Sequence, residues 1–190
     1  MGIQRRKHNR KTDRMSDVGF RLMTLMYKFV DFFYPFDKRV KMLNIKEGFT
    51  VIDYGCGPGR YVGSVSQLVG ENGKVYAVDI HRLAIEEVKN KITKYNLKNV
   101  EPILVKGYNC EIRDNTADLI YALDMFHMIN EPSELLNEFH RILKPNGTLI
   151  IEDGHQPRTE TKREINESKM WHIDKESKDH LKCSPIATIC

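Results

Sequence analysis

The chain has 190 residues and a mass of 22.2 kDa, the size of one ordinary globular domain. Its 41% apolar and 29% charged residues exclude a disordered chain, and no apolar run approaches the ~18 residues that a membrane span needs. The formal net charge is +4, yet six of the first 14 residues are basic and one is acidic, so the other 176 hold 24 basic and 25 acidic residues. Basicity therefore belongs to an arm at residues 1–14, which we expect to be flexible, and the body gives no reason to expect a nucleic-acid surface.

The cysteine content indicates the redox compartment. Four cysteines without a CxxC pair are too few for a disulfide scaffold: Cys56, Cys110, Cys183 and Cys190. They favour reduced thiols in the cytoplasm. The basic arm is followed by polar residues rather than an apolar stretch, so no secretory signal is expected.

Residues 15–44 are predicted to form an N-terminal helical segment. Ser16 is a suitable N-cap and Pro35 a stop, and the apolar positions between them repeat with helical spacing: Val18, Leu22, Leu25, Met26, Phe29, Val30 and Phe33. We expect this helix to dock on the core or over a pocket mouth. The alternative is that the basic arm and the helix lie on a membrane surface as a peripheral contact.

Strand-like and helix-like segments alternate through the rest of the chain. Strands are predicted at 50–54, 74–78, 103–106, 117–123 and 148–152, with a short last strand at 186–189; helices are predicted at 60–69, 81–95, 133–143 and 160–173. This alternation is typical of βαβ units. The expected fold class is therefore α/β, a Rossmann-like, mostly parallel sheet with helices on both faces.

A glycine-rich loop follows the first predicted strand. Asp53 ends the strand, and Gly55, Gly57 and Gly59 let the backbone turn tightly and let a ligand approach closely. About 20 residues further, Asp79 ends the second strand, where a carboxylate can bind the hydroxyls of a ribose. Because ligands of open parallel sheets bind at the carboxyl ends of the strands, these residues predict a nucleotide site.

The spacing of the loop argues against a dinucleotide. A GxGxxG fingerprint requires glycine at position 60, which is Arg60, and a carboxylate at Asp53 would repel a pyrophosphate. An acid in this place suits a cationic ligand instead, such as an amino group or a sulfonium. An NAD-dependent oxidoreductase is therefore a weak alternative.

Four segments together resemble the class I S-adenosylmethionine-dependent methyltransferases, especially the small-molecule enzymes of the ubiquinone/menaquinone and type 11 groups. The segments are 51–59, 77–79, 117–128 and 143–149. The resemblance covers about residues 45–153 and implies a cofactor-binding methyltransferase domain over 45–190, with S-adenosyl-L-methionine as its cofactor.

The resemblance also implies roles for individual residues. The methionine part of the cofactor would be held by Asp53, Gly55, Cys56, Gly57 and Gly59. Asp79 would bind the ribose and Ile80 the adenine. The family often places Gly-Asp-Ala after the third strand, whereas this chain has Gly107-Tyr108-Asn109, so Asn109 is the expected adenine contact. The family also commonly ends with a helix and two strands; residues 153–190 predict one helix and at most one strand, hence a shortened sheet.

The methyl acceptor is expected between the N-terminal helix and the ends of the fourth and fifth strands. Asp124 and His127 are the candidate catalytic residues, since either could take a proton from the acceptor; Tyr34, Asp153 and His155 lie nearby in this interpretation. The alternatives are that His127 only packs and that Asp124 is a solvated strand end. The seven histidines show no ligand spacing, so no metal site is expected.

We therefore predict methyl transfer by in-line displacement to a small-molecule or lipid-like acceptor. A non-catalytic cofactor-binding or interaction protein is the alternative, motivated by the shortened C-terminal region. An RNA methyltransferase recruited through the arm is a further alternative. Nucleic acid is not the expected partner, because residues 122–126 lack the Asn/Asp-Pro-Pro-aromatic sequence of base-amine methyltransferases.

Overall fold

The computed structural model describes residues 14–33 and 37–187. Nearly the whole predicted arm and the acceptor-site candidate Tyr34 lie outside the described residues. Within them, no helix is both long and apolar enough to cross a bilayer.

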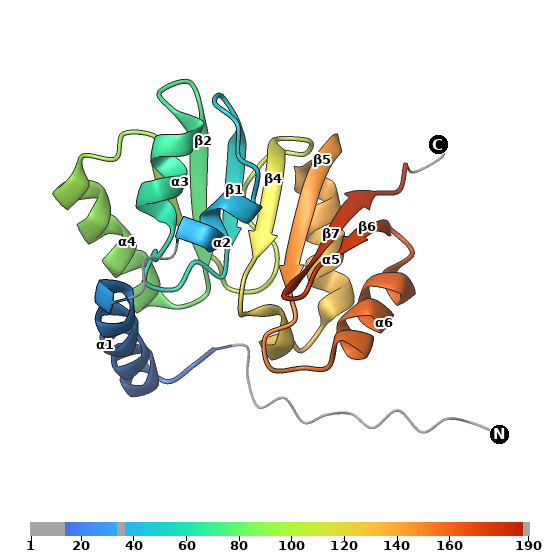
Figure 1. Ribbon diagram of the computed structural model, residues 1–190, viewed down its shortest axis with the longest axis horizontal. Coiled ribbons are helices and arrows are strands. Elements are labelled where there is room, and N and C mark those ends of the chain that lie inside the picture. The colour runs from blue at the N-terminus through green and yellow to red at the C-terminus, as the bar shows by residue number, and fades with distance from the viewer. Residues whose placement is uncertain (1–13, 34–36, 188–190) are drawn as a thin grey trace.

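Seven strands form one sheet in the order β3-β2-β1-β4-β5-β7-β6 (Figure 1). Their bounds are Thr50–Tyr54 (β1), Lys74–Asp79 (β2), Val100–Leu104 (β3), Ala117–Ala122 (β4), Leu143–Glu152 (β5), Trp171–Glu176 (β6) and His180–Pro185 (β7). The first five are parallel to one another, while β7 is antiparallel to both β5 and β6. The predicted Rossmann-like, mostly parallel fold is confirmed.

Six α-helices and one short 3-10 helix accompany the sheet in the described part of the chain. They are Asp17–Phe33 (α1), Asp37–Met42 (α2), Val62–Val69 (α3), Arg82–Tyr95 (α4), Phe126–Met128 (η1), Pro132–Ile142 (α5) and Arg158–Ser168 (α6). Ser16 caps α1 as predicted, accepting a hydrogen bond from the Gly19 N–H at 3.2 Å.

The sheet separates two apolar cores because neighbouring side chains on a strand point to opposite faces. On β1, Val51 packs with α3 and α4, and Ile52 packs with α5 and α6. On β5, Ile150 belongs to the first core and its neighbour Ile151 to the second. Because helices cover both faces of the sheet, the polar side chains of these strands can reach a ligand only at the strand ends.

The prediction of a shortened C-terminal sheet is wrong. The helix predicted over 160–173 ends at Ser168, because Lys169 adopts a left-handed conformation (φ +58°), and the chain enters β6 at Trp171. Ile186 and Ala187, assigned to the predicted last strand, lie after β7, and residues 188–190 are outside the described part. The edge strand β6 keeps most of its side chains in solvent, so its polar composition resembled a helix surface.

The predicted third strand is also displaced. The structure places β3 at residues 100–104 rather than 103–106, pairing Ala77 with Pro102. The proline was interpreted as the residue before the strand, but an edge strand tolerates it when the missing N–H would face solvent. The chain leaves the sheet after Leu104 and runs toward the cavity described below.

Candidate functional site

A cavity opens at the carboxyl ends of β1, β2 and β4, beneath α1. In Figure 1, α1 stands beside the end of the sheet to which the arrow of β4 points. The free space, including the mouth and the solvent-filled opening, is about 1030 Å³. Its walls combine polar residues of the strand ends with apolar residues of α1 and η1: Met15, Phe20, Met23, Tyr27, Arg39, Tyr54–Pro58, Arg60, Tyr61, Asp79–His81, Val105, Gly107, Tyr108, Leu123–Met125, Met128 and Ile129.

The glycine loop, residues 55–59, forms the floor of the cavity. Gly55, Gly57 and Gly59 have φ angles of +75°, +51° and +67°, a region that side-chain-bearing residues rarely adopt. A Cβ on Gly57 would meet nothing within 4 Å, so the backbone there is open to a ligand. A Cβ on Gly59 would lie 2.8 Å from Val88 Cγ2, so this glycine serves the packing of the loop on α4.

Asp79 lies at the end of β2 with its carboxylate on the cavity wall. One oxygen accepts from the Gly57 N–H at 2.8 Å and the other from the His81 N–H at 2.7 Å. Burial raises the pKa of Asp79, and these backbone N–H groups oppose the rise. The carboxylate is thus fixed in orientation, and each oxygen keeps lone-pair capacity for a ligand hydroxyl.

Asp53, at the end of β1, is buried below the glycine loop. Its Oδ2 has no hydrogen-bond partner among the described residues. Burial raises the pKa of Asp53 to about 7, with Tyr121 and Lys91 opposing the rise and Asp79 adding to it. A buried acceptor without a partner is costly, and a cationic donor such as the amino group of a bound ligand would satisfy it.

The loop after β3 brings Gly107 and Tyr108 to the cavity, together with Val105. The Tyr108 carbonyl accepts from the Tyr54 hydroxyl at 2.6 Å, and its own hydroxyl accepts from the Glu131 N–H at 3.1 Å. A Cβ on Gly107 would meet nothing within 4 Å, so a planar ligand has room beside it.

Asn109, the predicted adenine contact, is turned away from this wall. Its amide donates to Glu138 Oε2 on α5 at 3.3 Å. Glu138 is buried and also accepts from the Cys110 N–H and from Arg141, each at 2.7 Å. Although burial opposes it, Arg141 and the Cys110 N–H hold the pKa of Glu138 below its usual value. Asn109 therefore helps to fix the loop to α5 through Glu138, while Tyr108 lines the cavity.

The other end of the cavity is bounded by α1 and the ends of β4 and β5. Asp124 lies on the cavity wall and accepts a hydrogen bond from the Tyr27 hydroxyl of α1 at 3.3 Å. Burial and Asp124 raise the pKa of Tyr27 despite the nearby Arg60, whose guanidinium carbon is 4.7 Å from the Tyr27 ring centre. Arg39 reaches the same wall and pairs with Glu152 at 3.2 Å.

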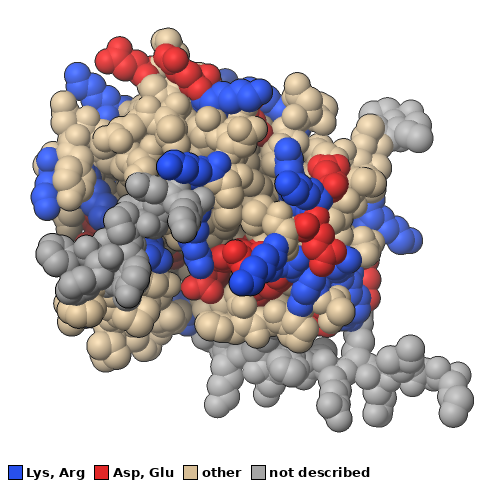
Figure 2. Space-filling model, in the orientation of Figure 1, with Lys and Arg blue, Asp and Glu red and all other residues tan. Residues whose placement is uncertain are grey.

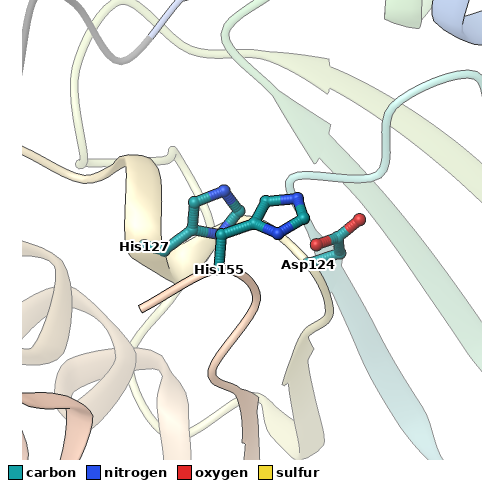
Figure 3. A group of neighbouring side chains, drawn as sticks. All are labelled: Asp124, His127 and His155. Atoms are coloured by element: carbon teal, nitrogen blue, oxygen red, sulfur yellow. The ribbon is translucent and has the colours of Figure 1, made fainter. Parts of the chain in front are cut away.

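Three candidates from two loops form a group, which we name the Asp–His cluster: Asp124, His127 and His155 (Figure 3). One ligating atom of each lies within 4.8 Å of the others, and the two imidazoles meet edge to face with centres 5.0 Å apart. Asp153, the remaining described candidate, pairs with Arg158 at 2.5 Å. Of the described acceptor-site candidates, three thus form the Asp–His cluster, whereas Asp153 forms an ion pair with Arg158.

The sequence predicted that the N-terminal helix borders the acceptor site, but it did not identify which residues of α1 line the cavity, nor Arg60 and Tyr61 after the glycine loop. Phe20, Met23 and Tyr27 line the cavity, although the apolar repeat predicted a different inward face. Phe20 stacks on His81 with ring centres 4.4 Å apart, which ties α1 to the beginning of α4. The signal was the i, i+3, i+7 spacing of Phe20, Met23 and Tyr27, which the longer apolar repeat obscured.

Comparison with known proteins agrees with this geometry. Residues 45–184 match a family described as methyltransferase domain. A demethylmenaquinone methyltransferase of Staphylococcus saprophyticus is 34% identical over 125 residues, 64% of this chain and 52% of that protein. A ubiquinone/menaquinone biosynthesis C-methyltransferase of Escherichia fergusonii is 28% identical over 130 residues, 68% of this chain and 52% of its own. The chain spans about half the length of these curated relatives.

A solved structure extends the agreement to the whole fold. The S-adenosylmethionine-dependent methyltransferase of Aquifex aeolicus superposes with a TM-score of 0.72 at 27% identity, over 79% of this chain and 89% of that one. Because the family match covers most of the chain and includes every strand of the sheet, the chain belongs to the class I S-adenosylmethionine-dependent methyltransferases.

Proposed function

We propose that the protein binds S-adenosylmethionine in this cavity and transfers its methyl group to a small apolar acceptor. The observation that carries the proposal is the pair of buried carboxylates at neighbouring strand ends, Asp53 and Asp79, beside an open glycine loop. Asp53 suits the amino group of the methionine part, and Asp79 suits two vicinal hydroxyls.

The remaining cofactor contacts follow from the cavity wall. Gly55, Cys56 and Gly57 would face the methionine part, with Gly59 supporting the loop from behind. Ile80, Tyr108 and Gly107 would enclose the adenine, and Asn109 would act only through the anchored loop. The bound cofactor supplies a methyl group on a sulfonium, which the acceptor displaces in line. The protein's own task is to hold the two reactants aligned and away from water.

The walls of the acceptor end indicate the chemistry of the acceptor. Met15, Phe20, Met23, Met128 and Ile129 present apolar surface. Asp124, on the cavity wall, would take a proton from a hydroxyl or an activated ring carbon, and His127 adjoins it in the Asp–His cluster. The curated relatives are named as quinone methyltransferases, which supports an aromatic or lipid-like acceptor for this chain.

The outer face of α1 supports contact with a membrane surface. Five large apolar side chains, the apolar stripe, are each more than half exposed: Val18, Leu22, Leu25, Met26 and Phe29. Arg14, Arg21 and Lys28 lie on the same helix region, and the sequence before it is basic. A helix with this pattern binds anionic bilayers in the plane of the interface. We therefore assign this surface to an anionic membrane that holds the acceptor.

The alternatives are weaker than the proposed enzyme. The non-catalytic alternative loses one of its motives, because the seven-stranded sheet is not shortened. Figure 2 shows Lys and Arg interspersed with Asp and Glu over the visible face of the described residues, so RNA recruitment would depend on the arm at residues 1–14. The family match disfavours an NAD-dependent oxidoreductase. The three cysteines among the described residues are buried and free, which agrees with the reducing conditions of a cytoplasm.

Calorimetry with S-adenosylhomocysteine tests the proposal. The wild-type chain should bind it, and Asp79→Ala should weaken binding roughly tenfold or more, which corresponds to about 1.4 kcal/mol. Asp118→Ala is the matched control: Asp118 lies near the beginning of β4, away from the cavity at the carboxyl ends of the strands, where it accepts from the Thr50 N–H and from Lys144. No binding by the wild type, or equal losses in both variants, would contradict the assignment of the cavity.

The acceptor class needs a second experiment. Incubation with methyl-labelled S-adenosylmethionine and a fractionated cell extract should place the label in the lipid or small-molecule fraction. Label that enters only protein or RNA would overturn the proposed acceptor while leaving cofactor binding intact.

A further inference from the structure

The Asp–His cluster contains a third potential metal ligand, His155, besides the two candidate proton acceptors Asp124 and His127. Asp124 and His127 lie in the connection that follows β4, and His155 lies in the one that follows β5, so two segments converge at the carboxyl ends of two neighbouring strands. Figure 3 shows one Asp124 carboxylate oxygen directed toward the imidazole of His155, with the His127 ring on the far side of that imidazole.

We propose that Asp124, His127 and His155 bind one divalent transition-metal ion at the edge of the acceptor site. Two imidazoles and one carboxylate are the ligand set of Zn²⁺ and non-haem Fe²⁺ sites that keep coordination positions open. An oxygen-only set would instead favour Mg²⁺ or Ca²⁺.

The distances permit a shared ion after small rotations. Metal–ligand bonds of about 2.0–2.2 Å place two ligands of one ion no more than about 4.2 Å apart. The three ligating atoms lie within 4.8 Å of one another. Asp124 and His155 are exposed and can close the remaining gap by turning about their side-chain bonds, while the partly buried His127 provides the fixed position.

Residues around the cluster hold its members in place. The Tyr27 hydroxyl donates to Asp124 Oδ2, which leaves Oδ1 for an ion and resembles the outer hydrogen bonds that orient metal-binding carboxylates. Gly154 packs against His127 so closely that a Cβ there would lie 2.0 Å from His127 Nδ1. The left-handed backbone of Asp124, with φ at +54°, is unusual for a residue with a side chain and turns the carboxylate toward the loops.

The charge balance around the cluster also suits a cation. The neighbouring carboxylates Glu152 and Asp153 are paired with Arg39 and Arg158. The hydrogen bond to Asp124 comes instead from the neutral hydroxyl of Tyr27, and Arg39, which also interacts with the Asp124 charge, forms its ion pair with Glu152.

The position of the ion would matter for the acceptor, and this step rests on the proposed function. Asp124 belongs both to the cluster and to the cavity wall. An acceptor oxygen that occupied an open coordination position would lose its O–H proton to solvent more readily, because a bound cation lowers the pKa of a coordinated hydroxyl. The acceptor class would then be molecules that present an oxygen donor beside the methylated atom.

Metal binding is tested on the full chain without any cofactor. After treatment with a chelator, the protein is titrated with Co²⁺ and followed by visible absorption, then with Zn²⁺ by calorimetry. We expect one ion per chain, a Co²⁺ spectrum without thiolate bands, and a loss of affinity of roughly tenfold or more in His155→Ala and in Asp124→Ala. His172→Ala is the matched control, since His172 is an exposed histidine 3.1 Å from an aspartate, Asp174, outside the cluster.

Several results would overturn the proposal. They are no binding by the wild type, thiolate bands that place the ion on cysteines, or equal affinity in wild type and in both cluster variants. Gly154→Ala is a second probe that removes no ligand: it should displace His127 and weaken Co²⁺ binding while circular dichroism shows the fold retained.

Measuring S-adenosylhomocysteine affinity in the same samples separates the two proposals. His155→Ala should lose the ion and keep cofactor affinity. A protein that binds the ion but not S-adenosylhomocysteine would remove the proposed function and leave the metal site standing.

Discussion

At the scale of single residues, the most informative group is the Asp53 carboxylate. It is buried beneath the glycine loop, and its Oδ2 lacks a partner among the described residues. Burial raises its pKa to about 7, so near neutral pH the carboxyl group is divided between its charged and neutral forms. The buried Asp53 carboxylate thus destabilises the chain without a ligand, and a bound cationic group would stabilise its charged form.

This group predicts a dependence of stability on pH. Between about pH 4 and pH 7 the folded chain retains the Asp53 proton and the unfolded chain has lost it, so the free energy of unfolding should fall as the pH rises. A change of pKa from 3.8 to about 7 corresponds to roughly 4 kcal/mol. Urea denaturation at several pH values should show the fall in the wild type and a flatter profile in Asp53→Asn. Identical profiles would contradict the assignment to Asp53.

The sequence predicted the residues of the glycine loop and placed Asp124, His127 and His155 at one acceptor site, but it did not predict that their ligating atoms lie within 4.8 Å of one another. Asp53 and Asp79 lie at the carboxyl ends of two predicted parallel strands, so the strand prediction alone indicates that both belong to one site. His155 joins Asp124 and His127 only through the pairing of β4 with β5, and no spacing along the chain records that contact. Asn109 shows the same limit, because its partner Glu138 lies 29 residues away on α5.

At the scale of elements, two faces of α1 have different surroundings. Phe20, Met23 and Tyr27 line the cavity, while the apolar stripe is exposed. The spacing of the stripe predicted a helix correctly and its buried face wrongly, because hydrophobic periodicity identifies an apolar face without identifying what covers it.

The apolar stripe predicts binding to anionic vesicles. The double variant Leu25→Ser, Phe29→Ser should reduce co-sedimentation with phosphatidylglycerol-containing vesicles roughly tenfold or more, since burying each side chain contributes about 1.5–3 kcal/mol. Leu68→Ser is the control, because Leu68 is an exposed leucine on α3. Equal binding by both variants, or by neutral vesicles, would remove the membrane from the proposal.

The C-terminal hairpin was missed for a physical reason. The apolar alternation of β6 is short: Trp171 and Ile173 are followed by three charged residues, so residues 171–173 were interpreted as the end of the preceding helix. The central strands were located well because both of their faces are buried, which gives short continuous apolar runs.

At the scale of the whole molecule, the hairpin of β6 and β7 completes one of the two cores. Trp171, Leu181 and Cys183 are buried with α5 and α6 in that core. The folded chain therefore depends on β6 and β7 for its stability, although the residues proposed to hold the cofactor lie elsewhere.

Substitution of Trp171 tests how much this hairpin contributes to the free energy of unfolding. Trp171→Ala should lower the free energy of unfolding by about 3–5 kcal/mol, because it leaves a large cavity in the core. Urea denaturation followed by far-ultraviolet circular dichroism measures the change. His172→Ala, on the same strand with its side chain in solvent, should stay within about 0.5 kcal/mol; similar losses in both variants would contradict the packing described.

The ends of the strand order have a consequence for self-association. At one margin, Val105 N–H donates to Asp79 O, so by alternation the amide position of Pro102 faces outward, where it has no hydrogen to donate. At the other margin, β6 carries charged side chains and an irregularity between Ile173 and Lys175. Both features hinder the addition of a further strand. A second copy of this chain would therefore find helical surfaces, rather than a sheet margin, on which to pair.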